Sequence, residues 1–374
     1  MTNMTGLDDT DFPHVQAIDV ACYRIPTDAP EGDGTLRWSE TELVVVHVEA
    51  GGMVGMGYSY TAALPAARLI LDKLSPAVVG RCVYDIPALW GEMNDRLRNI
   101  GRPGLGLMAI AAVDQALWDL KARLLDLPLS ALWGRARASI PIYGSGGFVT
   151  YSAVRLQRQL EGWLEQGLTS VKIKVGDDVD QAEQRVMLAR EVIGPEIHLM
   201  VDANGACRTR EALALAECLG EHRVCWFEEP VSSDDLEGLR WLRDRVPENM
   251  AIAAGEYGWD SQYFRRMLQA GAVDVLQVDA TRCGYTGFLH AAELCAAFNV
   301  PLSAHCAPAL HTSLCVAVPG VRHAEYFHDH VRLEDMLFDS GDSLHGGELW
   351  PDLDRVGHGI ELRRADAEPY QISG

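Results

Sequence analysis

The sequence lacks an excess of basic residues, and this absence excludes several classes of partner. Its 374 residues include 32 lysines and arginines against 53 aspartates and glutamates, which gives a formal net charge of −21. Without surplus cations the chain cannot neutralise a row of phosphates, and an anionic membrane surface would repel it. We therefore expect neither nucleic acid nor a membrane as a partner.

Long apolar runs and ordered cysteine spacings are also missing. No apolar stretch reaches the roughly 18 residues of a membrane-spanning helix. The first residues, MTNMTGLDDTDFPHVQ, contain neither the basic nor the apolar region of a secretory signal. The nine cysteines form no CxxC pair or other metal-ligand spacing, which is typical of reduced core thiols. We expect a cytoplasmic protein.

Apolar residues, by contrast, are plentiful and follow two different patterns. They make up 48% of the chain, and its length allows one barrel plus a smaller domain. After an N-terminal tail at 1–15, the unit at 16–137 begins with strand patterns at 16–24 and 41–50 and continues with helical patterns. Strands followed by helices predict an α+β domain, and we expect the C-terminal segment, about 340–374, to pack back on it.

Residues 138–339 change to short apolar strands that alternate with amphipathic helices. Eight such strands predict a parallel sheet covered by helices, which closes naturally into a barrel. The irregular sequence after the last strand predicts that one barrel helix is missing or replaced. An open doubly wound sheet is the alternative, but no GxGxxG follows the first strand. The expected strands are SIPIYG, TSVKIKV, IHLMVDA, VCWFEE, MAIAAGE, VDVLQVD, VPLSAH and RHAEYF.

Ionisable residues recur at or near the carboxyl end of every barrel strand from the second onward. Barrel active sites are built on this face, because the strand ends converge there. A single acid in such a place is usually a helix cap or a surface charge, but a run over seven consecutive strands favours a site. The residues in strand order are Lys172 and Lys174, Asp202, Glu228, Glu256, Asp279, His305 and Glu325.

Three of these acids, Asp202, Glu228 and Glu256, lie on consecutive strands, so a barrel would bring their carboxylates together. Like charges held this close need a cation or shared protons. Hard oxygen ligands without cysteine or clustered histidine select Mg²⁺ over zinc. We therefore predict one Mg²⁺ per subunit, which would also attract an anionic substrate to an acidic protein.

Two groups flank these acids and could transfer protons. Lys172 and Lys174 face the same side of their strand, and helices are expected outside, so both should enter the barrel mouth. Neighbouring ammonium groups lower each other's pKa, which would make Lys174 a general base that Lys172 orients. His305 could be an isolated core histidine, but Asp279 on the neighbouring strand could fix its tautomer and make it an acid or base.

In this order and at these intervals the motifs resemble the enolase superfamily, and within it the mandelate racemase-like subgroup, from about residue 16 to 366. The resemblance implies a modified TIM barrel, (β/α)₇β, with an N-terminal α+β capping domain. It also implies that Asp202, Glu228 and Glu256 bind Mg²⁺. Muconate cycloisomerase-like relatives carry a lysine on the sixth strand, where this chain has Asp279. The matching motifs are VKIKVG, VDANG, FEEP, AAGE, LQVDATRCG, SAHC and HAEYF.

The resemblance further implies an enzyme, a lyase or an isomerase, that acts on a small carboxylate. Lys174 would abstract the α-proton of a hydroxy-carboxylate, and Lys172 with Glu325, the latter as a hydrogen-bond donor, would stabilise the enediolate. Loss of water would make the enzyme an acid-sugar dehydratase. Racemisation or epimerisation of a 2-hydroxy acid and lactone cycloisomerisation use the same residues. A remote alternative is a non-catalytic barrel that binds metal or sugar acids.

Dehydration of a sugar acid is favoured because the segments expected to close the site are polar. They include the loop at 26–40 with Trp38, and Tyr58 and Tyr60 in the next segment, which suit a polyhydroxylated ligand. Asn204, two residues beyond Asp202, is expected to offer an amide to the substrate. Homo-oligomers are usual in such families, and we expect one here.

Overall fold

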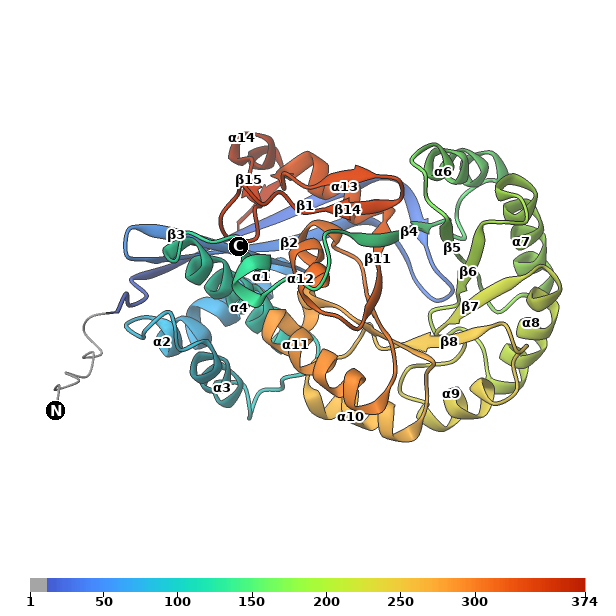
Figure 1. Cartoon of the computed structure of the whole chain (residues 1–374), viewed down its shortest axis with the longest axis horizontal. Helices are drawn as coiled ribbons and strands as arrows, with labels where there is room; N and C mark the ends of the chain where they lie inside the picture. Colours follow the sequence, from blue (N-terminus) through green and yellow to red (C-terminus); the bar gives the residue numbers. More distant parts are fainter. Residues whose placement is uncertain (1–11, 374) are drawn as a thin grey trace.

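The structure is a computed structural model that describes residues 12–373, so most of the expected tail at 1–15 lies outside the described residues. An antiparallel sheet with its helices lies on one side, and a ring of parallel strands and helices lies on the other (Figure 1). The predicted modified TIM barrel with a capping domain is confirmed. No helix in the described part of the chain is long and apolar enough to cross a membrane.

The capping sheet contains two long strands, a third that the sequence did not reveal and a short C-terminal strand described below. β1 (Ala17–Gly32) and β2 (Arg37–Ala50) pair along nearly their whole length, so the expected loop at 26–40 is a hairpin with a short turn. β3 (Met53–Tyr60) adds a third strand beside β2. The helices are α1 (Ala63–Leu69), η2 (Ile70–Leu74), α2 (Ser75–Val78), α3 (Ile86–Arg96), α4 (Leu105–Leu124) and α5 (Leu129–Trp133).

Strand β2 is apolar on both faces because it lies between two cores. Val44 and Val46 belong to the core under the cap helices, whereas Leu43 and Val45 belong to the core shared with the barrel. Burial on both sides explains why TELVVVHVEA has no polar alternation. The cap is therefore fixed to the barrel by an apolar face of its own sheet.

Strand β3 escaped prediction because it is rich in glycine, which is normally depleted in strands. Here the glycines allow the strand to lie directly against α4. A Cβ at Gly57 would overlap Ala112 O and would lie 2.7 Å from Ala116 N. In the sequence, the glycines therefore mark a strand whose backbone lies close to a helix, and no hydrophobic periodicity accompanies them.

All eight predicted barrel strands are present, and β11 pairs with β4 to close the ring. The strands are β4 (Ile140–Gly146), β5 (Ser170–Lys174), β6 (His198–Asp202), β7 (Val224–Glu228), β8 (Ala251–Ala254), β9 (Val275–Val278), β10 (Leu302–Ala304) and β11 (Val321–Phe327). The helices between them are α6 (Ala153–Glu165), α7 (Val179–Ile193), α8 (Thr209–Glu221), α9 (Leu236–Arg243), α10 (Ser261–Ala270), α11 (Ala280–Phe298) and α12 (Pro308–Ala317).

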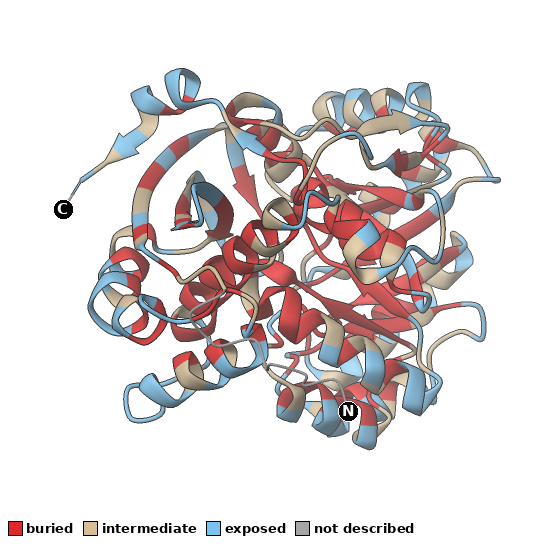
Figure 2. Ribbon diagram, turned by 60° about the vertical axis from the view of Figure 1, so that its left-hand side comes forward, coloured by how far each residue is buried: buried red, intermediate tan, exposed pale blue. Residues whose placement is uncertain are grey.

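Helices α6 to α10 surround the outside of the ring (Figure 1), and buried residues concentrate on the strands and the inner helix faces (Figure 2). Inside the barrel, Tyr143, Met200, Trp226, Ala253 and Val275 form a separate apolar cluster. His323, which bonds Ser303, packs against Tyr143 and Trp226 of this cluster, whereas the charged residues predicted as the site lie at the other end of the strands.

The chain after β11 differs from the irregular segment expected there. α13 (His328–Leu337) follows β11 at once, and only then do short elements begin. Two of these pair with the domains described above: β14 (Glu348–Trp350) with β4, and β16 (Gln371–Ile372) with β1. The others are β12 (Phe338–Asp339), β13 (Ser343–His345), β15 (Glu361–Leu362), α14 (Arg364–Ala367) and η3 (Glu368–Tyr370).

Candidate functional site

The ionisable residues predicted at the strand ends all lie buried at the mouth of the barrel. Each is at most 7% exposed, so their charges must be balanced by one another or by a ligand. The group comprises Lys172, Lys174, Asp202, Glu228, Glu256, Asp279, His305 and Glu325.

Lys172 forms ion pairs with three acids of this group. Its Nζ lies 2.5 Å from Glu228 Oε1, 2.8 Å from Glu325 Oε1 and 3.9 Å from Asp202 Oδ2. Beneath it the ring of Tyr143, part of the apolar cluster, lies 5.4 Å from Nζ. Lys172 therefore ties the third, fourth and eighth strands together and separates the polar site from the apolar interior.

Lys174 is directed at a carboxylate rather than at the other lysine. Its Nζ donates a hydrogen bond to Asp202 Oδ2. Burial lowers the pKa of Lys174, but Asp202 and the neighbouring glutamates outweigh burial and Lys172 and raise it. The expectation of a lowered lysine pKa is therefore wrong for this arrangement, because the nearest charge is negative. A cation that engaged Asp202 would weaken this effect.

Two of the three acids predicted as ligands, Glu228 and Glu256, gather around one point, whereas the oxygens of Asp202 accept hydrogen bonds from Lys174 Nζ and Asn204 N. Glu228 and Glu256 have oxygens within 4.8 Å of each other and of a His305 nitrogen. Glu256 Oε2 is buried and has no hydrogen-bond partner among the described residues, although His305 Nε2 lies 3.3 Å away. Burial, Asp202 and the other glutamates raise the pKa of Glu228 to about 8, despite the opposing charge of Lys172. Such crowded, partly unpaired oxygens fit Mg²⁺.

Asp279 and His305 form the predicted pair, with 3.0 Å between Asp279 Oδ2 and His305 Nδ1. Asp279 also caps α11 by accepting a hydrogen bond from Thr281 N, so the helix start fixes its position. Burial lowers the pKa of His305, but Glu256, Glu325 and Asp279 outweigh it and raise it to about 9. The pairing leaves Nε2 of His305 directed into the barrel mouth, toward Glu256.

Glu325 was predicted as a hydrogen-bond donor, but in the structure it accepts hydrogen bonds. Its Oε1 accepts hydrogen bonds from Ser145 Oγ at 2.5 Å and from Lys172, and its Oε2 accepts one from Cys306 N at 3.0 Å. Burial raises the pKa of Glu325, but Lys172 and His305 outweigh it and hold the pKa below its ordinary value. In this arrangement Glu325 is a carboxylate that orients its neighbours, so a role as donor would need a proton from them.

The tip of the β1–β2 hairpin covers the mouth of the barrel. A Cβ at Gly34 would overlap Ala203 O and lie 2.9 Å from Val175 O, at the ends of two barrel strands. Val149 N donates to Gly32 O at 2.8 Å, and Thr150 Oγ1 donates to Pro30 O at 2.7 Å. The hairpin is thus in contact with the loop after β4 and closes the site.

Trp38 and Tyr60 lie at this closed mouth. Trp38 meets Phe148 edge-on with 5.5 Å between ring centroids, and its Nε1 donates to Glu31 Oε2 at 2.8 Å. Tyr60 stacks on His330 with 3.6 Å between centroids, and its buried hydroxyl has no hydrogen-bond partner within residues 12–373. Both positions are compatible with the predicted contact with substrate.

Asn204 and Tyr58 were both predicted to bind substrate, but only Asn204 has a polar side-chain atom without a hydrogen-bond partner among the described residues. Asn204 adopts a left-handed backbone conformation, φ 47°, and its Oδ1 is buried without a hydrogen-bond partner in the described structure. Tyr58 is fully buried under α13, stacked on Phe338, and its hydroxyl donates to Glu334 Oε1 at 2.7 Å. Because that hydroxyl is already engaged, the structure removes Tyr58 from the substrate-binding group.

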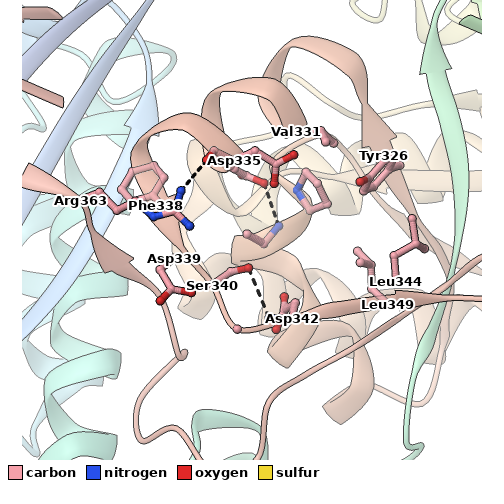
Figure 3. Close-up of a pocket in the computed structure, with 14 residues that line it drawn as sticks. Tyr326, Val331, Asp335, Phe338, Asp339, Ser340, Asp342, Leu344, Leu349 and Arg363 are labelled. Atoms are coloured by element: carbon pink, nitrogen blue, oxygen red, sulfur yellow. Dashed lines mark hydrogen bonds between the residues drawn. The ribbon is translucent and has the colours of Figure 1, made fainter. Parts of the chain in front are cut away.

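A separate cavity of about 370 Å³ lies beside α13 (Figure 3). Figure 3 shows Arg363 Nη1 donating to Asp335 O, 2.8 Å away, at one end of this cavity, and Leu344 and Leu349 at the other. Of the described residues that line the cavity, none belongs to the predicted site. The chemistry is therefore concentrated at the covered barrel mouth.

Sequence reasoning missed four polar residues in this region: Ser145, Glu229, Cys306 and Glu31. Ser145 ends the first barrel strand, so the strand-end rule would have found it had it been applied to all eight strands. Glu229 follows a predicted ligand, is buried and has φ 36°. Glu31 is buried although it stands in a polar segment, and burial raises its pKa to about 8. No local pattern announces it.

Comparison with known proteins identifies the family. Residues 20–134 match "Mandelate racemase / muconate lactonizing enzyme, N-terminal domain", and residues 155–367 match "Enolase C-terminal domain-like". A mandelate racemase/muconate lactonizing enzyme-like protein from Rubrobacter xylanophilus superposes with a TM-score of 0.93 at 47% identity, covering 96% of this chain and 100% of that one.

Relatives with named activities are more distant. The 3,6-anhydro-alpha-L-galactonate cycloisomerase of Streptomyces coelicolor is 31% identical over 93% of this chain and 97% of its own length. L-Talarate dehydratase from Polaromonas sp. JS666, complexed with Mg and L-glucarate, has a TM-score of 0.87 at 28% identity and covers 96% of this chain and 98% of that one. The chain therefore belongs to the mandelate racemase/muconate lactonizing enzyme family of the enolase superfamily.

Proposed function

We propose that the protein removes the proton next to the carboxylate of a hydroxy acid, with Mg²⁺, and then eliminates water, as an acid-sugar dehydratase. One observation carries this proposal. Asp202 ends β6, Glu228 ends β7 and Glu256 follows β8; in the strand order Lys174, on β5, precedes these acids and the Asp279–His305 pair comes after them. The proposed reaction needs two proton transfers, first from the α-carbon and then to or from a second position. One proton-transfer group on each side of a cation site can perform them.

Asp202, Glu228 and Glu256 would hold the ion, since they are oxygen donors and Glu256 Oε2 lacks a hydrogen-bond partner in the described residues. When bound, Mg²⁺ supplies Lewis-acid stabilisation of the negative charge that develops on the substrate carboxylate. The ion also explains how a protein of net charge −21 can attract an anion.

The side chains of this chain would perform the remaining steps. Lys174 Nζ, once Asp202 is engaged by the ion, takes the α-proton, and Lys172 donates hydrogen bonds toward the developing charge. His305 gives a proton from Nε2 to the β-hydroxyl, so that the C–O bond breaks and water leaves. The product is a 2-keto-3-deoxy acid after tautomerisation. Asp279 holds the imidazole in place through Nδ1.

A hydroxylated acid is supported by two buried oxygens of the cover, Tyr60 Oη and Glu31 Oε1, which have no hydrogen-bond partner among the described residues. They lie beside an aromatic cluster of Phe148, Tyr151 and Phe327, so the cover is mixed in character. The relationship to a dehydratase crystallised with L-glucarate supports a sugar acid as the substrate class.

Cycloisomerisation is the second candidate, because a relative aligned over 93% of the chain is a cycloisomerase acting on an anhydro sugar acid. The same abstraction at the α-carbon would then be followed by cleavage of an intramolecular C–O bond at the β-carbon. The leaving oxygen would stay in the molecule and take the proton from His305, so that an isomer forms instead of water being lost. The two outcomes differ only in what accepts the proton from His305.

The proposal is tested by incubating the purified protein, Mg²⁺ and a panel of aldonic, aldaric and anhydro sugar acids in D₂O. Dehydration gives a 2-keto acid, detected by semicarbazone absorbance, together with deuterium at C3. Epimer or isomer with α-deuterium and no keto acid would replace dehydratase by racemase or cycloisomerase. Absence of both keto acid and α-exchange across the panel, with Mg²⁺ shown by calorimetry to be bound, would contradict the proposed chemistry.

A further inference from the structure

We propose that His305, Cys306 and Glu325 form a second metal site, which binds a thiophilic divalent cation such as Zn²⁺ and thereby blocks the barrel mouth. The three residues come from the ends of β10 and β11, and each is at most 7% exposed. This site is distinct in chemistry from the all-oxygen arc of Asp202, Glu228 and Glu256, because it offers one nitrogen, one sulfur and one oxygen.

The distances between the three donor atoms are those of one face of a tetrahedron. Cys306 Sγ lies 3.3 Å from His305 Nε2 and 3.7 Å from Glu325 Oε2, and Nε2 lies 3.6 Å from Oε2. Tetrahedral zinc with ordinary Zn–S, Zn–N and Zn–O lengths requires separations of about 3.6, 3.6 and 3.4 Å. All three agree to within about 0.3 Å, so an ion would need little movement of the protein.

Each donor atom can offer a lone pair to an ion. His305 uses Nδ1 to bond Asp279, which leaves Nε2 as the ligand and reproduces the carboxylate–histidine arrangement that supports zinc. Glu325 commits Oε1 to Lys172 and Ser145, while its Oε2 accepts hydrogen bonds from Cys306 N and from the Cys306 thiol. Metal binding would release the thiol proton to solvent, which frees one lone pair on Oε2 and one on Sγ for the ion.

The backbone at Cys306 has an unusual conformation. Cys306 has φ 54° and Ala307 has φ 38°, two consecutive non-glycine residues in the left-handed region. Such a conformation costs of order 1–3 kcal/mol at each residue and persists where the surroundings impose it, often at ligand sites. Here it accompanies a thiol, 4% exposed, that lies beside the imidazole.

A metal ion bound at this site would prevent His305 from transferring protons. A metal on Nε2 removes the lone pair that accepts a proton, and it also draws Glu325 Oε2 away from its other neighbours. The site would therefore make the protein sensitive to thiophilic cations even when Mg²⁺ is in large excess. The competing explanation is that the thiol only forms hydrogen bonds to Nε2 and Oε2 and holds no ion.

Co²⁺ titration in saturating Mg²⁺ distinguishes the two, because a thiolate ligand gives Co²⁺ an intense charge-transfer absorption in the near ultraviolet. We expect this band in the wild type and its loss in Cys306→Ser. Cys225→Ser is the matched control, since Cys225 Sγ lies 4.0 Å from His198 Nδ1 and is the chain's other cysteine–histidine contact among the hydrogen bonds described. It should keep the band.

Zn²⁺ competition against the Co²⁺ band should give an affinity that Cys306→Ser lowers by more than about 100-fold, because a direct ligand is lost. A band that Cys306→Ser retains, or one that Cys225→Ser abolishes, would overturn the proposal. So would a wild type without a band.

X-ray absorption at the zinc edge makes the test independent of whether Cys306→Ser folds. Cys225→Ser protein loaded with one equivalent of Zn²⁺ in excess Mg²⁺ should show one sulfur at about 2.3 Å and nitrogen or oxygen at about 2.0–2.2 Å. A shell without sulfur would refute the site. No substrate is used, so failure of the proposed dehydration would leave this result unaffected.

Discussion

The contact between Gly34 and the barrel predicts that a single methyl group will lift the hairpin that covers the site. In Gly34→Ala the new Cβ overlaps Ala203 O and lies 2.9 Å from Val175 O, and both atoms belong to backbone that cannot rotate away. Ordinary carbon–oxygen contact therefore requires the tip to retreat by about 1 Å, and overpacking of this kind costs about 1–3 kcal/mol.

The retreat can be measured without knowing the substrate. Val149 N donates to Gly32 O on the hairpin, so its amide exchanges with solvent when the hairpin opens. A cost of 1–3 kcal/mol should accelerate exchange at Val149 by roughly 5- to 150-fold. Hydrogen exchange followed by NMR or mass spectrometry would report this acceleration.

Gly91→Ala is the matched control, because nothing lies within 4 Å of a Cβ at Gly91 and its φ is outside the left-handed region. That variant should leave exchange at Val149 unchanged. If Gly34→Ala exchanged at the wild-type rate at Val149, the hairpin tip would not rest on the strand ends, and the closed site described above would be wrong.

Three further predictions follow from single contacts. Mg²⁺ at 100 times its dissociation constant should stabilise the wild type by about 2.7 kcal/mol in thermal unfolding, and Glu256→Gln should lose most of that gain; equal gains would exclude Glu256 as a ligand. Burial raises the pKa of Asp114 to about 7, although Thr286 lowers it, so the folded state holds a proton that the unfolded chain releases at lower pH. Stability from this group is therefore lost as pH rises through 7, and urea unfolding should show the wild type falling by roughly 2 kcal/mol relative to Asp114→Asn between pH 5 and 8; parallel curves would contradict this. Tyr58→Phe should cost about 1–2 kcal/mol in urea unfolding, since it removes the hydrogen bond to the buried Glu334, and an unchanged midpoint would show that the bond does not form.

The sequence was most informative where polar residues interrupt apolar strands. Asp202, Glu228 and Glu256 could be placed together because the strand period and barrel closure determine where strand ends meet. The same rule placed Asp279 beside His305, and the structure gives their hydrogen bond at 3.0 Å.

Contacts between distant segments could not be read in this way. From the sequence we predicted that Tyr58 binds substrate. In the structure its hydroxyl donates a hydrogen bond to Glu334, which is 276 residues away in the chain. The direction of the pKa shift at Lys174 depends on which charge lies nearest to its ammonium group. The sequence does not give such interatomic distances. β3 was not predicted because Gly57 lets the strand pack closely against α4 and does not contribute to a periodic apolar pattern.

Loss of the α-hydrogen, followed as keto-acid formation or as deuterium at the α-carbon, tests the central claim most directly, namely that Lys174 removes this proton. On any acid of the panel that the wild type converts with Mg²⁺ in D₂O, Lys174→Ala should slow this loss by about 10²- to 10⁴-fold. Calorimetry should show that the variant still binds Mg²⁺. Loss of the α-hydrogen in Lys174→Ala at the wild-type rate on every converted acid would contradict the account.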